Sequence, residues 1–301
     1  MWLLLAFTSA ILLGFYDTSK KAALKDNAVL PVLLLNTLFC SLIFAPVTVS
    51  SIVAGTVSLK VHLLLFIKAC IVLSSWILGY FGLKHLPITT VGPINATRPV
   101  LVLIGAMIVF GERLNLLQWT GVILAFVSIF LLSISSREKE HIDFVHNRWI
   151  WCVAGAAVIG AISGLYDRYL ARMIEPEIVQ GWYNIYQFLL MGIICLAMRW
   201  LPSARLRKEN PSAGMVGGPF RWKWSILLIS LFISAADFAY FSSLQQPDSM
   251  ISVISLIRRG SVIVSFFCGV IIFKERKNMK AKLLDLGLIL LGMIFIWLGS
   301  R

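Results

Sequence analysis

The chain has 301 residues, of which 59% are hydrophobic and 14% charged, and its mean hydropathy is +0.87. A soluble domain of this length is far more polar, so the composition excludes a soluble globular protein and indicates a polytopic membrane protein. Lysine and arginine outnumber aspartate and glutamate by 27 to 14. We expect the lipid bilayer to be a partner of the chain and nucleic acid not to be one.

Ten apolar segments follow one another along the chain, and each is long enough for a membrane-spanning helix of ~17 to 25 residues. They lie at residues 2–22, 29–50, 61–83, 87–110, 115–135, 149–172, 177–200, 222–243, 247–273 and 282–300. The connections are short, except for a charged one at 136–148 and a basic one, rich in proline and glycine, at 201–223. We therefore predict an all-α integral membrane protein with ten transmembrane helices.

Two of these segments are related in sequence. Residues 87–113 and 247–276 both open with proline, place an arginine eleven residues later, at Arg98 and Arg258, and close with Phe-x-Glu-Arg. The match predicts an internal duplication, with five-helix repeats at 1–135 and 149–301 joined by the charged connection at 136–148. Because five is odd, the second repeat enters the membrane in the opposite direction, which predicts an inverted-topology repeat.

The duplicated motifs resemble those of the ten-helix EamA-like branch of the drug/metabolite transporter superfamily. The resemblance rests on Gly-x-Tyr-Asp at 14–17 and 164–167 and on Phe-x-Glu-Arg at 110–113 and 273–276. It implies a transporter with helices 1 to 4 and 6 to 9 around a central cavity and helices 5 and 10 at the periphery. The superfamily includes amino-acid and drug exporters and carriers of sugar phosphates and nucleotide sugars, so the substrate is not implied.

Four cations lie well inside the predicted spans: Lys68, Arg98, Arg258 and Arg259. A charge at the centre of a bilayer is costly and usually faces a bundle interior or a water-filled cavity on a substrate pathway. Arg98 and Arg258 lie at matched depth in the two repeats, and the planar guanidinium group binds carboxylate or phosphate through two hydrogen bonds. The pair at 258–259 is similar to the Lys-Arg pair with which plastid triose-phosphate translocators hold a phosphate. We predict an anionic small-molecule substrate.

Other polar and aromatic residues are candidates for the same cavity. The acidic residues inside the spans, Asp17, Asp167 and Asp237, are candidates for ion coupling or gating. The remaining substrate-binding candidates are Asn95, Tyr80, Tyr240, Tyr183, Asn184 and Gln187. The alternative is that the charges form structural ion pairs that do not contact substrate, for example Arg98 with Asp17 and Arg258 with Asp237.

No pattern in the sequence indicates catalysis, a metal or a cofactor. HExxH, GxSxG and Walker motifs are absent from the sequence, and its five cysteines include no CxxC pair. We predict a secondary transporter that moves a phosphorylated metabolite or a carboxylate by alternating access. An amino-acid or drug exporter with structural ion pairs and a non-transporting membrane subunit are the alternatives, and a homodimer is left open.

Lysine and arginine are unevenly divided between the two sides of the predicted bundle. Of the 27, 18 lie in the connections after helices 1, 3, 5, 7 and 9, 5 lie on the other side and 4 lie inside the spans. Short connections rich in lysine and arginine remain in the cytoplasm, so the count predicts extracytoplasmic termini, the reverse of the usual arrangement in the EamA-like family. We expect the plasma membrane of a bacterium.

Overall fold

The computed structural model describes residues 1–24, 27–55, 57–85, 88–135, 147–200, 220–272 and, except for 289, 293 and 296, 287–299. These residues form helices, short helical turns at 287–299 and connections, and no strand occurs among them. The helices are α1 (Trp2–Leu24), α2 (Val29–Ile43), α3 (Ala45–Ala54), α4 (Leu59–His85), α5 (Ile88–Phe110), α6 (Leu116–Ser135), α7 (Arg148–Ala171), α8 (Pro176–Trp200), α10 (Trp224–Gln245), α11 (Ile251–Arg259) and α12 (Ser261–Ile272).

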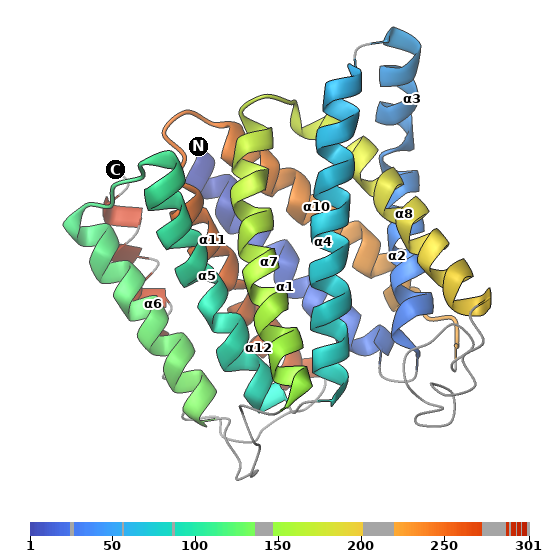
Figure 1. The fold of residues 1–301 in the computed structure, drawn as a ribbon. Coiled ribbons are helices and arrows are strands. Elements are labelled where there is room, and N and C mark those ends of the chain that lie inside the picture. The colour runs from blue at the N-terminus through green and yellow to red at the C-terminus, as the bar shows by residue number, and fades with distance from the viewer. Residues whose placement is uncertain are drawn as a thin grey trace.

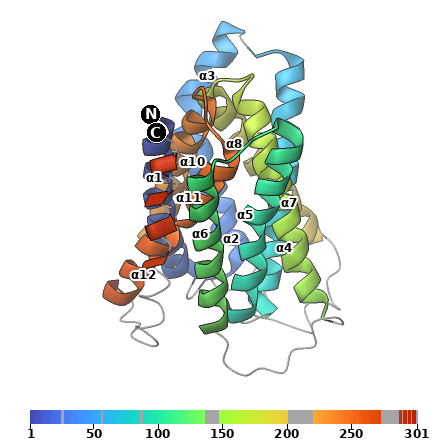
Figure 2. The same ribbon diagram turned by 90° about the vertical axis from the view of Figure 1, so that its left-hand side faces the viewer.

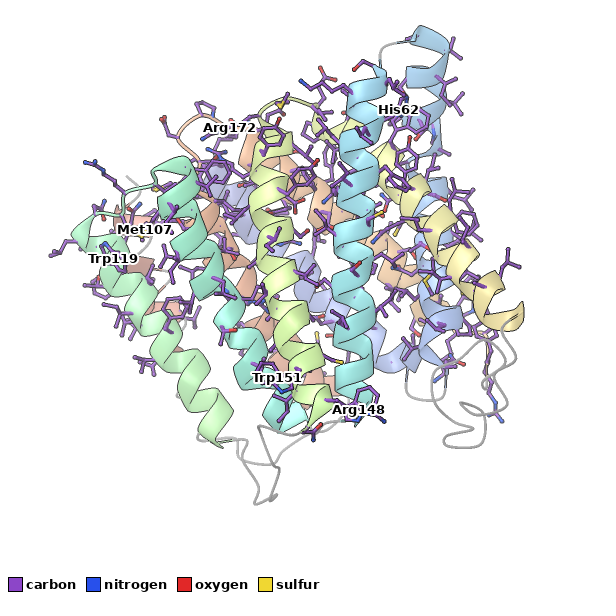
Figure 3. All side chains as sticks on the ribbon, viewed as in Figure 1. His62, Met107, Trp119, Arg148, Trp151 and Arg172 are labelled. Atoms are coloured by element: carbon purple, nitrogen blue, oxygen red, sulfur yellow. The ribbon has the colours of Figure 1, made fainter. Side chains whose placement is uncertain are left out.

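The helices run up and down along one common direction and form a single bundle (Figures 1 and 2). Hydrogen bonds place the beginning and the end of the described chain at the same end of this bundle. The Ser243 hydroxyl, at the end of α10, donates to the Trp2 carbonyl, and the Asn115 side chain, beyond the end of α5, donates to the Gly299 carbonyl. We call this end the terminal end. His62 and Arg172 lie near it, and Arg148 lies at the opposite end (Figure 3).

Packing between distant segments holds the bundle together. The most extensive contacts join α1 to α10 and α4 to α7, and α2 packs on α8. Small residues permit close approach between helices that lie within a bilayer. At Gly14 in α1, for example, an added Cβ would lie 2.4 Å from the Val264 Cβ of α12. Large apolar side chains such as Met107 and Trp119 remain exposed on the outside of the bundle, as expected for a surface that faces lipid (Figure 3).

Two predicted spans are interrupted. The segment predicted at 29–50 bends by 53° between α2 and α3. Pro46 lies in the first turn of α3, and it cannot donate the backbone hydrogen bond that would continue α2. The segment predicted at 247–273 divides into α11 and α12 at Gly260, whose N–H donates to the Ile257 carbonyl three residues earlier. Such a 3₁₀ step inside a helical segment is a common hinge geometry.

Within the described residues, five helices are long and apolar enough to cross a membrane, and six if the bent pair α2 and α3 is one span. Two shorter apolar helical stretches, Thr97–Phe110 and Leu290–Gly299, lie in the fourth and tenth predicted segments. Ten spans and their inverted repeat therefore stay a prediction. Most of the connection at 136–148 and the second Phe-x-Glu-Arg motif at 273–276 lie outside the described residues.

Candidate functional site

A polar cavity of about 390 Å³ lies inside the bundle, between α1, α4, α5, α7, α8, α10 and α11. Nine of the predicted site residues line it: Asp17, Lys68, Arg98, Asp167, Tyr183, Asp237, Tyr240, Arg258 and Arg259. The other four do not belong to this lining as far as the structure describes it. Asn184 and Gln187 line a smaller cavity next to it. Tyr80 and Asn95 lie in α4 and α5, and their side chains are outside the described part of the chain.

The first ion pair of the cavity joins α4 to α7. Lys68 Nζ lies 2.5 Å from Asp167 Oδ1, and the side chains of Lys68 and Asp167 are 4% and 11% exposed. The ammonium also lies over two aromatic rings, 4.4 Å from the centroid of Tyr183 and 4.7 Å from that of Phe241. Cation–π contacts at these distances add to the attraction of the carboxylate. Lys68 is therefore enclosed by protein groups on several sides and has a structural role whatever the substrate is.

The second ion pair joins α10 to α11. Arg258 Nη2 donates a hydrogen bond to Asp237 Oδ1, and the two atoms are 2.7 Å apart. The side chains of Arg258 and Asp237 are 18% and 22% exposed. The guanidinium group lies over the Tyr240 ring, 4.1 Å from its centroid. Arg258 thus has a carboxylate partner inside the protein. The pair of Arg258 with Asp237 is one of the two ion pairs suggested by the alternative in which the charges do not contact substrate. Arg258 nevertheless also lines the cavity.

Arg98 and Arg259 differ from these cations, because neither lies within ion-pair distance of a carboxylate in the described residues. Arg98 comes from α5 and packs against α7 at Gly160, which has no side chain to occupy the space of the guanidinium group. Arg259 is the last residue of α11, where a cation also compensates the negative end of the helix dipole. Both arginines line the cavity, as does Asp17, for which the described residues form no ion pair either.

Comparisons with known proteins show which proteins this chain resembles. Residues 1–134 match the model of the EamA-like transporter family. A protein of Archaeoglobus fulgidus named as an uncharacterized transporter is 23% identical over 279 residues, which cover 92% of this chain and 91% of the relative. A solved crystal structure is similar to this chain, with a TM-score of 0.72 and 17% identity. The alignment covers all of this chain and 97% of the other, and it shows the fold alone.

The family match over residues 1–134 and the relative that is named as a transporter point to transport rather than to an enzymatic reaction. The EamA-like motif after α5 has a visible structural role at the terminal end. Gly111 has a φ of +65°, a left-handed conformation that glycine adopts without strain, and Glu112 follows it. The Glu112 carboxylate accepts hydrogen bonds from the Ile251 N–H at 2.7 Å, the Ser252 N–H at 3.2 Å and the Ser252 hydroxyl at 2.5 Å. Glu112 therefore caps the start of α11, which has no side-chain cap from its own N-cap residue Met250.

A second contact holds the connection between α10 and α11 from the side of α7. The Arg168 guanidinium donates to the Leu244 carbonyl, to the Ser249 hydroxyl and, at 2.5 Å, to the Ser249 carbonyl. Arg168 follows the second Gly-x-Tyr-Asp motif directly, yet its side chain is only 6% exposed. Arg168 and Glu112 together attach the beginning of α11 to α7 and to the end of α5.

Tyr16, Lys20 and Trp76 are among the lining residues that sequence reasoning missed. Lys20 lies near the end of the predicted span at 2–22 and was not counted among the four cations well inside the spans, but α1 continues to Leu24. Its spacing of three residues from Asp17 places it on the same helix face and was a usable signal. Trp76 lies inside an apolar stretch, and nothing in its spacing distinguishes it from a residue that faces lipid.

Proposed function

We propose that this EamA-like protein is a secondary transporter of a small organic dianion, such as a phosphate monoester, by alternating access through the polar cavity. The observation that carries the proposal is the pair Arg98 and Arg259. Their guanidinium groups line a cavity in a membrane protein, and in the described part of the chain they have no carboxylate within ion-pair distance. Because an uncompensated charge inside a bundle is costly, an anionic guest would stabilise both residues.

The charges around the cavity favour a dianion over a monoanion. Five cationic side chains line it, against three carboxylates, so the lining has an excess of two positive charges. The pairs Lys68 with Asp167 and Arg258 with Asp237 each neutralise themselves. Arginine presents a planar set of donors that matches phosphate or carboxylate oxygens and stays charged at physiological pH. A phosphate monoester and a dicarboxylate both fit this lining, and the proposal covers both.

Alternating access is supported by a symmetry in the packing. If residues 1–135 and 149–301 are inverted repeats, the exchange of the two repeats converts α1 into α7 and α4 into α10. The two most extensive interfaces, α1 with α10 and α4 with α7, are related by this exchange, and the interface between α2 and α8 is converted into itself. The cavity lies between the halves, where transporters of this kind bind substrate and rock around it.

The three carboxylates of the cavity have different positions in this mechanism. Asp167 and Asp237 are in ion pairs with cations, whereas Asp17 lines the cavity without an ion pair in the described residues. We propose that Asp17 is the group at which proton coupling or gating acts. Uptake into vesicles with and without an imposed pH gradient tests this: identical flux under the two conditions would remove the coupling role and leave the rocking mechanism intact.

Asp17 also favours one second candidate, an amino-acid exporter. A zwitterion would place its carboxylate on Arg98 or Arg259 and its ammonium group on Asp17, since all three line the same cavity. An amino acid has no net charge, however, and it would leave the excess of two positive charges uncompensated. The dianion therefore remains the better match.

Counterflow with the purified protein in lipid vesicles tests the proposed function. We expect labelled phosphate monoesters or dicarboxylates to accumulate in vesicles preloaded with the same compound, and amino acids not to do so. The Arg98→Gln and Arg259→Gln variants should lose at least ten times more activity than the Arg113→Gln variant, a matched control at an exposed position. Preferred transport of an amino acid, with Asp17→Asn as the most damaging change, would establish the second candidate.

A further inference from the structure

A second cavity, which we call the amide pocket, lies next to the main cavity between α2, α8 and α10. Its volume is about 10 Å³, which is room for one water-sized group. Its polar lining consists mainly of uncharged side chains, Asn36, Gln180, Asn184, Gln187 and Ser234, and each of these residues is at most 5% exposed. A polar pocket at such depth is unusual, because polar groups that face neither water nor a partner are costly in a membrane protein.

Two carboxamide groups of the amide pocket have hydrogen-bond donors to spare. Gln180 and Gln187 are each 1% exposed, and they lie two turns apart on the same face of α8. The Nε2 atoms of both residues have no hydrogen-bond partner in the described part of the protein. The Oε1 of Gln180 accepts from Asn184, so its amino end is the one without a partner. The pocket therefore needs an acceptor, and a metal cation does not fit it because N–H donors repel a cation.

The amide pocket is adjacent to the proposed anion site. Four residues, Trp76, Tyr183, Ile233 and Asp237, line both cavities, so the two cavities share part of their walls. The carboxylate of Asp237 is an acceptor, whereas the amino groups of Gln180 and Gln187 are donors. A group that accepts from an amide and donates to a carboxylate satisfies both. A hydroxyl group does this, a carbonyl group cannot donate, and an ammonium group cannot accept.

We propose that the amide pocket is a subsite for one hydroxyl group of the transported anion, with Gln180 and Gln187 as specificity-determining residues. This inference rests on the proposed function, because it assumes that Arg98 and Arg259 hold the charged end of the molecule. The substrate is then a hydroxylated organic dianion, of which a polyol phosphate is the simplest example. In the empty protein a water molecule takes the place of the hydroxyl group.

Two pairs of probes separate the subsite from the anion site. Glycerol 3-phosphate and n-propyl phosphate have the same charge and the same number of carbon atoms and differ only in hydroxyl groups, as do sorbitol 6-phosphate and n-hexyl phosphate. We expect the purified protein to bind the hydroxylated member of at least one pair about tenfold more tightly, the size of effect that a hydrogen-bonding difference of ~1.4 kcal/mol produces. Titration calorimetry in detergent measures both dissociation constants.

The variants Gln187→Met and Gln180→Met test the role of the amides. Each should reduce the tenfold preference to less than about threefold and leave the affinity for the alkyl phosphate unchanged. Gln187→Met should leave the melting temperature of the empty protein nearly unchanged, because methionine has nearly the same shape, and Gln180→Met should lower it slightly more, because it also removes the Oε1 acceptor of Asn184. Gln245→Met, at an exposed position at the end of α10, is the matched control and should change nothing.

Three results would overturn the inference, and they are distinct from a failure of the proposed function. Equal affinities within both pairs in the unmodified protein would show that the pocket does not read hydroxyl groups. Equal weakening of both members of a pair in Gln187→Met would show a structural role only. An ordered water that stays in the amide pocket when glycerol 3-phosphate is bound would show that the pocket is only hydrated. If no phosphate or dicarboxylate binds at all, the proposed function itself fails, and the inference fails with it.

Discussion

A single methyl group added to α7 tests whether the position of Arg98 matters for anion binding. If Gly160 is replaced by alanine, the new Cβ would lie 2.8 Å from Cζ, 2.9 Å from Nε and 3.1 Å from Nη1 of Arg98. Carbon atoms in contact are normally about 3.5 to 4.0 Å apart. The guanidinium group must therefore move by roughly 1 Å, because the end of an arginine side chain yields more easily than the backbone of α7.

The size of the effect follows from this displacement. At an effective dielectric constant of about 20, a guanidinium group 4 Å from a charge interacts with it by about 4.15 kcal/mol, and at 5 Å by about 3.32 kcal/mol. For a dianion the loss is therefore about 1.7 kcal/mol, which corresponds to roughly a fifteenfold weaker affinity. Stability changes less, because alanine favours the helix over glycine by about 1 kcal/mol and offsets part of the overpacking cost of ~1 to 3 kcal/mol.

Titration calorimetry with glycerol 3-phosphate and with a dicarboxylate, on protein in detergent, measures the loss. Gly155→Ala is the matched control on the same helix, because its Cβ would lie 3.6 Å from Leu78 Cδ1, an ordinary contact distance. We expect this control to bind like the unmodified protein. If Gly160→Ala is folded and keeps its full affinity for the anion that the unmodified protein binds, Arg98 does not hold the substrate and the reasoning is refuted.

Three further predictions concern the ion pair of Lys68, the cap of α11 and the orientation of the chain in the membrane. Lys68→Met should lower the free energy of unfolding by ~3 to 5 kcal/mol, because it leaves Asp167 buried without its cation; the double variant Lys68→Met/Asp167→Asn should lose less than the sum of the two single variants, and additive losses in thermal unfolding would contradict the pairing. Glu112→Gln should cost about 1 to 3 kcal/mol, because hydrogen bonds to a charged acceptor are lost at the start of α11; an unchanged melting temperature, equal to that of Arg113→Gln, would show that the cap is unimportant. A C-terminal reporter that fluoresces only in the cytoplasm should stay dark in intact cells, since the excess of lysine and arginine lies in the connections opposite the termini; bright cells would place the termini inside.

The charged residues of the spans were visible in the sequence, but their partners were not. Asp167 follows Lys68 by 99 residues and Arg258 follows Asp237 by 21, and no local spacing rule relates residues that meet across helices. The matched positions of Arg98 and Arg258 suggested that these two arginines act together. In the structure Asp237 pairs with Arg258, and Arg98 and Arg259 are the arginines without a carboxylate partner among the described residues. Two arginines with matched positions in the predicted repeats can therefore have different surroundings.

The uncharged part of the site was the hardest to predict. Gln187 was a candidate because it lies in an apolar helix, but Gln180 was not, although both line the amide pocket. Their pairing depends on the seven-residue spacing along α8 and on the way in which α2 and α10 close the space in front of them. Spacing is a property of one helix and can be read from the sequence. The walls of the pocket, in contrast, depend on which helices become neighbours.

The sequence by itself determined that this is a helical membrane protein with motifs that resemble those of EamA-like transporters, because hydropathy and segment length depend only on local composition and the motifs are strings of residues. It also predicted seven of the eight charged residues that line the cavity, because a charge inside an apolar span must face away from lipid. Only the tertiary structure decided which cations are neutralised, where the amide pocket lies and that Glu112 caps α11. These features depend on distances between helices that are far apart in the chain, and such distances are set by the packing of the whole bundle.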